Sequence, residues 1–355
     1  MDQSTGYVLA LSGGRGEKKI SRSFNRATQS TRQPGSVFKT IAVFLPALDS
    51  CGLSLASTKE DEPYTTPDGY QPFNTNANSY QGTTTIREAI THSMNVVTTK
   101  WLVEDVTPKL SIEYLENLGI TTMDEENDAY APLGLGGISN GVTNLELTGA
   151  YAAIANGGYL VTPYIVDSIT DDAGNIISQT DTSVRRQVIS EEVSQEILSM
   201  MENNVDPNGT LSIRHSCKNA YVAGYRIGGK SGTAERTDRH LRGDGDYYKA
   251  MSFSAVLPIN DPEIEVFVLL DDPRWIHDYA SQVVAPVVGN IISEVAPYLG
   301  IEQDANYNPT GNVTVQTCLD YTWTNAQVTL NQLGLQHKLI GSNGNIVYQY
   351  PVGGS

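Results

Sequence analysis

The sequence PGSVFKTIAVFLPALDS, residues 34–50, opens with a proline, a glycine and a serine and is apolar almost throughout. Proline and serine favour the start of a helix, and a helix that is apolar nearly all round is normally buried in a core. Ser36 and Lys39 lie three residues apart, so they share one helix face, one turn apart. The segment therefore predicts a buried helix with a serine and a lysine at its N-terminal end.

This pair suits nucleophilic chemistry. A serine hydroxyl is a weak nucleophile until a base takes its proton, and a lysine can do so only when burial or a nearby cation lowers its pKa. The apolar neighbours of Lys39 predict that burial, and the amides at a helix N-terminus can stabilise an oxyanion. Alone, however, an S-x-x-K pattern more often places a lysine on the surface near a helix cap.

Two further motifs make the pattern specific. Ser93-Met94-Asn95 follows a short helix expected at residues 85–92, and Lys230-Ser231-Gly232-Thr233 lies in a strand. A strand glycine such as Gly232 allows a substrate backbone to approach closely. S-x-x-K, S-x-N and K-[ST]-G-T in this order are typical of serine enzymes that attack amides. Together they predict one acyl-transfer site.

A phosphate-binding loop is the competing interpretation of the third motif. Residues 224–231 fit G-x-x-x-x-G-K-[ST], and the apolar strand 264–272 ends in two acids, as a magnesium-holding strand would. Such a loop requires a helix that starts at its Lys-Ser pair. Residues 232–239, GTAERTDR, have no apolar period and are rich in turn formers. The acyl-transfer interpretation is therefore favoured.

Charge excludes one class of partner. The formal net charge of −17 argues against nucleic acid, whose phosphates require Lys and Arg, and disfavours anionic lipid. No signal peptide is evident, and the longest apolar run, 41–48, is too short to cross a bilayer. We expect the chain to be a piece of a longer protein.

Metal and cofactor sites find no support in the sequence. The three cysteines are widely separated and predict neither disulfides nor metal binding, and the five histidines lack paired spacing. GDGD at 243–246 predicts a polar turn and not a calcium loop. GLGGISNG at 134–141 predicts a loop and not a dinucleotide site. We expect no metal and no cofactor.

The order of elements predicts an α/β (α+β) sandwich in which helices flank a largely antiparallel sheet. Residues 51–84 are expected to form a loop. The other expected elements are a strand at 6–12, helices at 34–50, 85–92, 142–156 (ending at Gly157-Gly158), 191–205 (capped by Ser190) and 279–298, a hairpin at 171–177, and strands at 221–229, 249–257 and 263–272.

The C-terminal part is expected to be separate from a main domain at 1–300. Residues 301–311 are expected to be a linker, and 312–355 a small α/β segment. That segment holds an expected strand at 313–319, an expected helix at 324–334 and a tight turn at Asn343-Gly344. Its length makes independent folding marginal.

These motifs and their surroundings resemble penicillin-binding protein transpeptidase domains. SFNRATQSTRQPGSVFKT (23–40) is similar to the nucleophile segment of bifunctional, class A members, and the similarity continues at 6–14, 87–100 and 141–165. By contrast, 219–235 and 252–273 resemble the monofunctional, class B branch. Residues 312–355 resemble a PASTA module cut short before its final strand. The resemblance implies the penicillin-binding/serine β-lactamase-like fold.

The resemblance also implies roles for the motif residues. Ser36 would attack the penultimate D-alanine carbonyl of a peptidoglycan stem peptide and form an acyl-enzyme, with Lys39 as base. Ser93 would relay the proton to the leaving D-alanine, and Asn95 would hold the donor's amide and orient Lys39. Lys230 would add positive charge near Ser93.

The remaining implied roles concern binding. Ser231 and Thr233 would bind the donor's terminal carboxylate beside Gly232, and the amides of Ser36 and Thr233 would form the oxyanion hole. An amine of a neighbouring stem peptide would accept the acyl group, and β-lactams would acylate Ser36 and remain. The full-length protein would act outside a bacterial membrane, anchored by an upstream segment, with a glycosyltransferase domain if it is class A.

Three alternatives stay open. A serine β-lactamase needs a second base, and Glu125, Glu126 and Glu146 have no recognisable setting for that role. A D,D-carboxypeptidase differs only in its use of water as acceptor. A non-catalytic β-lactam sensor or wall-binding module would bind without turnover.

Overall fold

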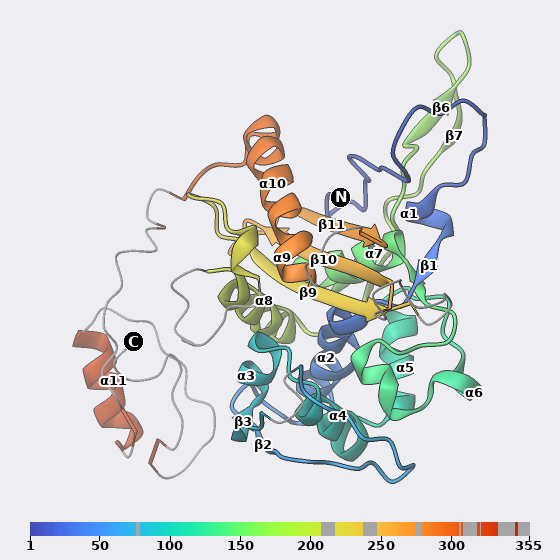
Figure 1. Ribbon diagram of the computed structural model, residues 1–355. Coiled ribbons are helices and arrows are strands. Elements are labelled where there is room, and N and C mark those ends of the chain that lie inside the picture. The colour runs from blue at the N-terminus through green and yellow to red at the C-terminus, as the bar shows by residue number, and fades with distance from the viewer. Residues whose placement is uncertain are drawn as a thin grey trace.

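An antiparallel sheet of three strands lies at the centre of the molecule (Figure 1). The computed structural model describes residues 1–75, 79–206, 217–236, 247–273 and 279–304, and residues 307, 318–319, 321–332 and 345–346 of the C-terminal segment. The strands are β9 (Gly228–Glu235), β10 (Lys249–Leu257) and β11 (Ile264–Asp271), in the order β11-β10-β9. Within the described residues, β9 is therefore an edge strand.

Alternating side chains of β10 face opposite sides of the sheet. Met251, Phe253 and Ala255 join an apolar cluster with Val288 and Ile292. The last two belong to α10 (Ala285–Leu299), which covers this face together with α9 (Ala280–Val283) (Figure 1).

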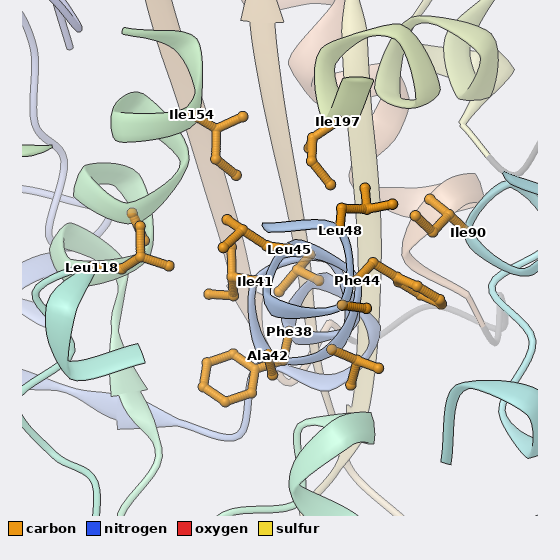
Figure 2. Close-up of a cluster of buried hydrophobic side chains, with 14 of the residues drawn as sticks. Phe38, Ile41, Ala42, Phe44, Leu45, Leu48, Ile90, Leu118, Ile154 and Ile197 are labelled. Atoms are coloured by element: carbon orange, nitrogen blue, oxygen red, sulfur yellow. The ribbon is translucent and has the colours of Figure 1, made fainter. Parts of the chain in front are cut away.

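The opposite face packs on α7 (Asn144–Ala155) and α8 (Glu191–Val205), and the start of the helix at residues 35–49 contacts β9 and β10. This helix comprises a 3₁₀ turn (Gly35–Val37), a π-helical stretch (Thr40–Phe44) and α2 (Leu45–Asp49). Its apolar side chains radiate toward surrounding elements, including α7 and α8 (Figure 2). The helix has no solvent-facing side, which explains why its sequence is apolar nearly all round.

The other elements form smaller sheets and surrounding helices. They are α1 (Arg26–Gln29), β1 (Thr31–Arg32), β2 (Thr58–Asp61), β3 (Gly82–Thr85), α3 (Ile86–Thr91), α4 (Val96–Trp101), a π-helical stretch (Leu102–Val106), α5 (Pro108–Asn117), α6 (Glu125–Asp128), a 3₁₀ helix (Ala131–Leu135), β4 (Val142–Thr143), β5 (Tyr159–Val161), β6 (Ser168–Thr170), β7 (Ile176–Gln179), β8 (Arg185–Gln187), a 3₁₀ turn (Lys218–Ala220) and α11 (Trp323–Gln332). Four antiparallel strand pairs, β1–β4, β2–β3, β5–β8 and β6–β7, lie outside the central sheet.

Most expected elements are confirmed, and local capping explains several boundaries. Thr85 begins α3 and Thr143 begins α7, each in a reciprocal capping box with a glutamate three residues later. Ser190 caps α8 as expected by accepting a hydrogen bond from the backbone N–H of Val193. The 171–177 hairpin is the β6–β7 turn, and the strands expected at 249–257 and 263–272 are β10 and β11.

The strand expected at residues 6–12 is wrong. Asp2 accepts hydrogen bonds from the backbone N–H groups of Ser4 and Thr5, so the chain turns immediately. Only isolated bridges form, from Asp2 to Ile264 and from Tyr7 to Tyr164. The apolar run thus packs beside other elements without joining a strand ladder.

Three other expectations need correction. Residues 51–84 include β2 and β3, whose polar sequences TKED and GTTT lack the apolar alternation that predicts strands. The strand expected at 221–229 begins only at Gly228. The helix expected at 279–298 is broken at Val284, because Pro286 lies in the first turn of a new helix, where a missing N–H is tolerated.

The C-terminal segment is described only in part. Its expected helix is confirmed as α11, and Thr322 forms an isolated bridge with Asn345. Residues 313–317, 243–246 and the turn Asn343-Gly344 lie outside the described residues. The PASTA-like module and the boundaries 1–300, 301–311 and 312–355 remain predictions. None of the described helices has both the length and the apolar character to cross a membrane.

Phe44 tests the importance of the buried helix. Its side chain has no exposed surface and its ring packs edge-on against Trp101 at 5.8 Å. Phe44→Ala should lower the free energy of unfolding by about 3–5 kcal/mol, because it leaves a cavity in a close-packed core. Phe24→Ala, at a residue 56% exposed, is the matched control and should change it little. Equal losses of unfolding free energy for the two variants, measured by denaturant unfolding, would contradict a central role of Phe44 in the core.

Candidate active site

Three glycines bring the backbone around Ser36 together. A Cβ on Gly35 would lie 2.5 Å from the Thr233 carbonyl oxygen, and one on Gly232 would lie 2.4 Å from that of Pro34. A Cβ on Gly136 would similarly lie 2.5 Å from the Gly35 carbonyl oxygen. The start of the buried helix, strand β9 and the glycine-rich loop at 134–141 can therefore meet only because these positions lack side chains.

Lys39 is fully buried beneath the S-x-N turn. Its Nζ donates to the carbonyl oxygens of Ser93 at 2.5 Å and Met94 at 3.1 Å, and to Asn95 Oδ1 at 2.5 Å. Ser93 Oγ lies 3.4 Å from the same nitrogen. The S-x-N motif thus provides every hydrogen-bond acceptor of Lys39 within the described residues.

Ser93 has a left-handed backbone conformation, with φ of 52°. This conformation costs a non-glycine residue about 1–3 kcal/mol. It lets the chain turn between α3 and α4 and directs the Ser93 hydroxyl between two lysines. Lys230 Nζ lies 3.0 Å from Ser93 Oγ. Ser93 is therefore the shared polar contact of both lysines.

Both lysines have lowered pKa values. Burial lowers the pKa of Lys230 to about 8. Burial, and secondly the positive charge of Lys230, lower the pKa of Lys39 well below its ordinary value. The oxygens around Lys39 oppose this effect because they accept hydrogen bonds from its charged form. A neutral Lys39 would retain two N–H donors and gain a lone pair that can accept a proton.

Ser36 occupies the 3₁₀ turn that begins the helix and is half-buried. Within the described contacts, no hydrogen bond joins its hydroxyl to Lys39 or Ser93. Hydrogen bonds between such groups are often long before a substrate binds. The arrangement therefore places the Ser36 hydroxyl, the candidate nucleophile, one helical turn from a buried amine.

Strand β9 presents the third motif beside this turn. Lys230 is buried, whereas Ser231 and Thr233 are partly exposed. Thr233 Oγ1 accepts a hydrogen bond from the Ala280 N–H at 2.9 Å, so its own O–H can donate to a ligand. An edge strand also has main-chain groups that can pair with an extended peptide.

Two supporting residues that the motifs do not include lie in the segment 51–84. Asn74 Oδ1 accepts from the backbone N–H groups of Asn95 and Val96. Asp61 accepts from Asn74 Nδ2. The only sequence signal was the general tendency of asparagine to cap helices, because Asn74 lies 21 residues before Asn95, the N-cap residue of the helix that it contacts.

The fold, and the hydrogen-bonded group of Lys39, Ser93, Asn95 and Lys230 beside the turn that holds Ser36, are typical of serine acyl-transfer proteins. A family model described as penicillin binding protein transpeptidase domain matches residues 1–293. The chain therefore belongs to the penicillin-binding protein transpeptidase domain family, as its motifs indicate. The penicillin-binding/serine β-lactamase-like fold is likewise confirmed.

Named relatives support this assignment. Stage V sporulation protein D of Bacillus subtilis is 32% identical over 60% of this chain and 33% of its own length. Penicillin-binding protein 1A of Clostridium perfringens is 28% identical over 90% of this chain and 37% of its own. The chain thus spans about a third of these curated relatives.

Solved structures share the fold. A peptidoglycan synthetase from Bifidobacterium adolescentis gives a TM-score of 0.72 at 21% identity, covering 86% of this chain and 57% of that one. The TP domain of Burkholderia pseudomallei penicillin-binding protein 3 gives 0.64 at 26% identity, with 86% and 88% covered. Penicillin binding protein 3 from Mycobacterium tuberculosis, complexed with ampicillin, gives 0.67 at 22% identity, with 80% and 66% covered.

Lys230 should titrate at about pH 8, because burial disfavours its charged form. The group is charged below that pH and neutral above it, so attraction of an anion should weaken as the pH rises through about 8. An NMR titration of the lysine side chains measures the midpoint, and the Lys230→Arg protein identifies the signal by its loss. A midpoint near the ordinary value of about 10.4 would contradict this environment.

Proposed function

We propose that this protein is a serine-type D,D-transpeptidase that cross-links peptidoglycan stem peptides through an acyl-enzyme on Ser36. One observation carries the proposal: the buried Lys39 amine contacts the S-x-N turn one helical turn from Ser36, with Lys230 on the same Ser93 hydroxyl. Burial gives Lys39 the lowered pKa that a neutral base requires.

The first step is acylation. Ser36 Oγ bonds to the carbonyl carbon of the penultimate D-alanine while its proton passes to Lys39 Nζ. The backbone amides of Ser36 and Thr233 stabilise the negative oxygen of the tetrahedral intermediate. When the C–N bond breaks, Ser93 relays the proton from Lys39 to the nitrogen of the departing D-alanine. Lys39 is then neutral again.

Substrate binding uses the edge strand. An extended donor peptide can add to the free edge of β9 through main-chain hydrogen bonds. The hydroxyls of Ser231 and Thr233 donate to its terminal carboxylate, Gly232 permits its close approach, and the charge of Lys230 attracts it. Asn95 holds the donor's amide while its Oδ1 orients Lys39.

The second step transfers the acyl group to an acceptor. The amine of a neighbouring stem peptide attacks the ester carbonyl and releases Ser36, which regains its proton from Lys39. Water in place of the amine gives D,D-carboxypeptidase activity. A β-lactam acylates Ser36 in the same way, but its leaving group remains tethered, so the acyl-enzyme persists.

β-Lactamase activity has weaker support because it needs a second base. Glu125 and Glu126 are exposed in the first turn of α6. Glu146 is engaged in the capping box of α7 and in hydrogen bonds with Thr121. Their positions fit helix capping and a solvated surface better than deacylation.

The family assignment also supports a location at the cell wall, outside a bacterial membrane. We propose that the full-length protein is held there by an upstream anchor and that stem peptides and β-lactams are its ligands. The segment 312–355 is proposed to be a PASTA-like module.

Labelled penicillin should attach covalently to the protein in a one-to-one ratio, with the mass increase on the peptide that contains Ser36. Ser36→Ala should abolish labelling, because it removes the nucleophile. Ser178→Ala, on the exposed strand β7, is the matched control and should label fully. Persistent stoichiometric labelling of the Ser36→Ala protein would sink the proposal.

Turnover separates the alternatives once acylation is established. Transfer from a thioester donor to an amine identifies a transpeptidase, and hydrolysis alone identifies a carboxypeptidase. Rapid hydrolysis of a chromogenic cephalosporin would favour a β-lactamase. Acylation by penicillin with no thioester turnover would favour a sensor.

A further inference from the structure

Asn95 occupies an unusual position for a helix-capping asparagine. It is the N-cap residue of α4, yet its side chain makes no capping hydrogen bond. Instead, Oδ1 accepts from Lys39 Nζ at 2.5 Å, and Nδ2 donates to the Phe73 carbonyl oxygen at 2.7 Å. An N-cap asparagine normally accepts from the first amides of its own helix. The start of α4 therefore needs another acceptor.

Asn74 provides that acceptor from outside the helix. Its Oδ1 accepts from the Asn95 N–H at 2.9 Å and the Val96 N–H at 3.3 Å. The Asn74 side chain thus holds the backbone N–H of the N-cap residue Asn95 and that of the first helical residue, Val96. Because Phe73 binds the Asn95 carboxamide nitrogen and Asn74 binds its backbone N–H, two consecutive residues fix both parts of Asn95.

Asp61 fixes the orientation of Asn74. The Asp61 carboxylate is almost fully buried, and both of its oxygens lie 3.0 Å from Asn74 Nδ2. One of them also accepts from the Gln81 N–H at 2.9 Å. A carboxylate in this role only accepts, so the amide nitrogen of Asn74 must face it. The Asn74 oxygen is then left facing the start of α4.

We infer that Asn74, oriented by Asp61, is a positioning residue that keeps the Asn95 carboxamide on Lys39 by holding the backbone N–H of Asn95 at the start of α4. The inference rests on the proposed acylation of Ser36. Without Asn74, the backbone N–H groups of Asn95 and Val96 lose their acceptor, so the backbone that carries the Asn95 side chain is no longer held in place. Lys39 would then lose Asn95 Oδ1 and its fixed position relative to Ser36.

Asn74→Ala should reduce the second-order rate constant for acylation by penicillin roughly tenfold to a hundredfold, the range expected when a reacting group is misplaced. Ser190→Ala is the matched control, because it removes the N-cap of α8 and leaves Lys39 and the S-x-N turn untouched. That control should lose comparable thermal stability and acylate at the wild-type rate. A wild-type rate in the folded Asn74→Ala protein would overturn the inference.

A double-mutant cycle tests whether Asn74 acts through Asn95. In an Asn95→Ala background there is no carboxamide to hold, so Asn74→Ala should lower acylation by less than about twofold. If Asn74 acts through general stability, the two rate losses should instead multiply. That multiplicative result would also overturn the inference.

An exchange of the two side chains keeps the test valid if Asn74→Ala fails to fold. Asn74→Asp alone places two carboxylates together and should acylate slowly. Adding Asp61→Asn restores the pairing with donor and acceptor exchanged, because the new amide at position 61 donates to the carboxylate at position 74. The other oxygen of that carboxylate can still accept from the Asn95 N–H, so acylation should recover at least tenfold. No recovery in a folded double variant counts against the inference. A wild-type protein that penicillin does not acylate refutes the proposed function instead.

Discussion

The site depends on the burial of one amine, that of Lys39, under a single turn of chain. A buried lysine without partners is costly, and its charged form is the more costly one. Three oxygens of the S-x-N turn limit that cost, while burial and Lys230 keep the pKa of Lys39 lowered. The balance allows the amine to gain and lose a proton in place, which acyl transfer requires.

This constraint explains why distant segments converge. The nucleophile helix must be buried to lower the pKa of Lys39, yet Ser36 must remain accessible at its start. The contacts at Gly35, Gly136 and Gly232 reconcile these demands, because a Cβ at any of them would collide with the main chain of the neighbouring segment. The left-handed backbone of Ser93 is a local strain that the surrounding contacts maintain.

Much of this arrangement could be predicted from local sequence. The buried helix, the helix caps at Ser190 and Gly157-Gly158, and strands β10 and β11 follow from apolar periodicity and capping residues. The motif residues were found because their order is specific. The structure brings Lys39, Ser93, Asn95 and Lys230 into one hydrogen-bonded group beside Ser36.

The remainder depends on contacts between distant segments. Asp61 and Asn74 lie in a polar segment whose sequence indicates only a loop, and their importance arises from α4 packing above them. The failed strand at 6–12 shows the opposite case, in which an apolar pattern gains only an isolated bridge from Tyr7 to Tyr164 and no strand ladder. Glycines at 134–141 predict a turn, but not that Gly136 would touch the nucleophile turn.

A crystal structure of the penicillin-treated protein is the most direct test of the account. It should show continuous density from Ser36 Oγ to the acyl carbon, with the carbonyl oxygen about 3 Å from the backbone nitrogens of Ser36 and Thr233. The β-lactam carboxylate should lie against Ser231 and Thr233. An acyl group on another side chain, or a carbonyl oxygen directed away from both amides, would contradict the account.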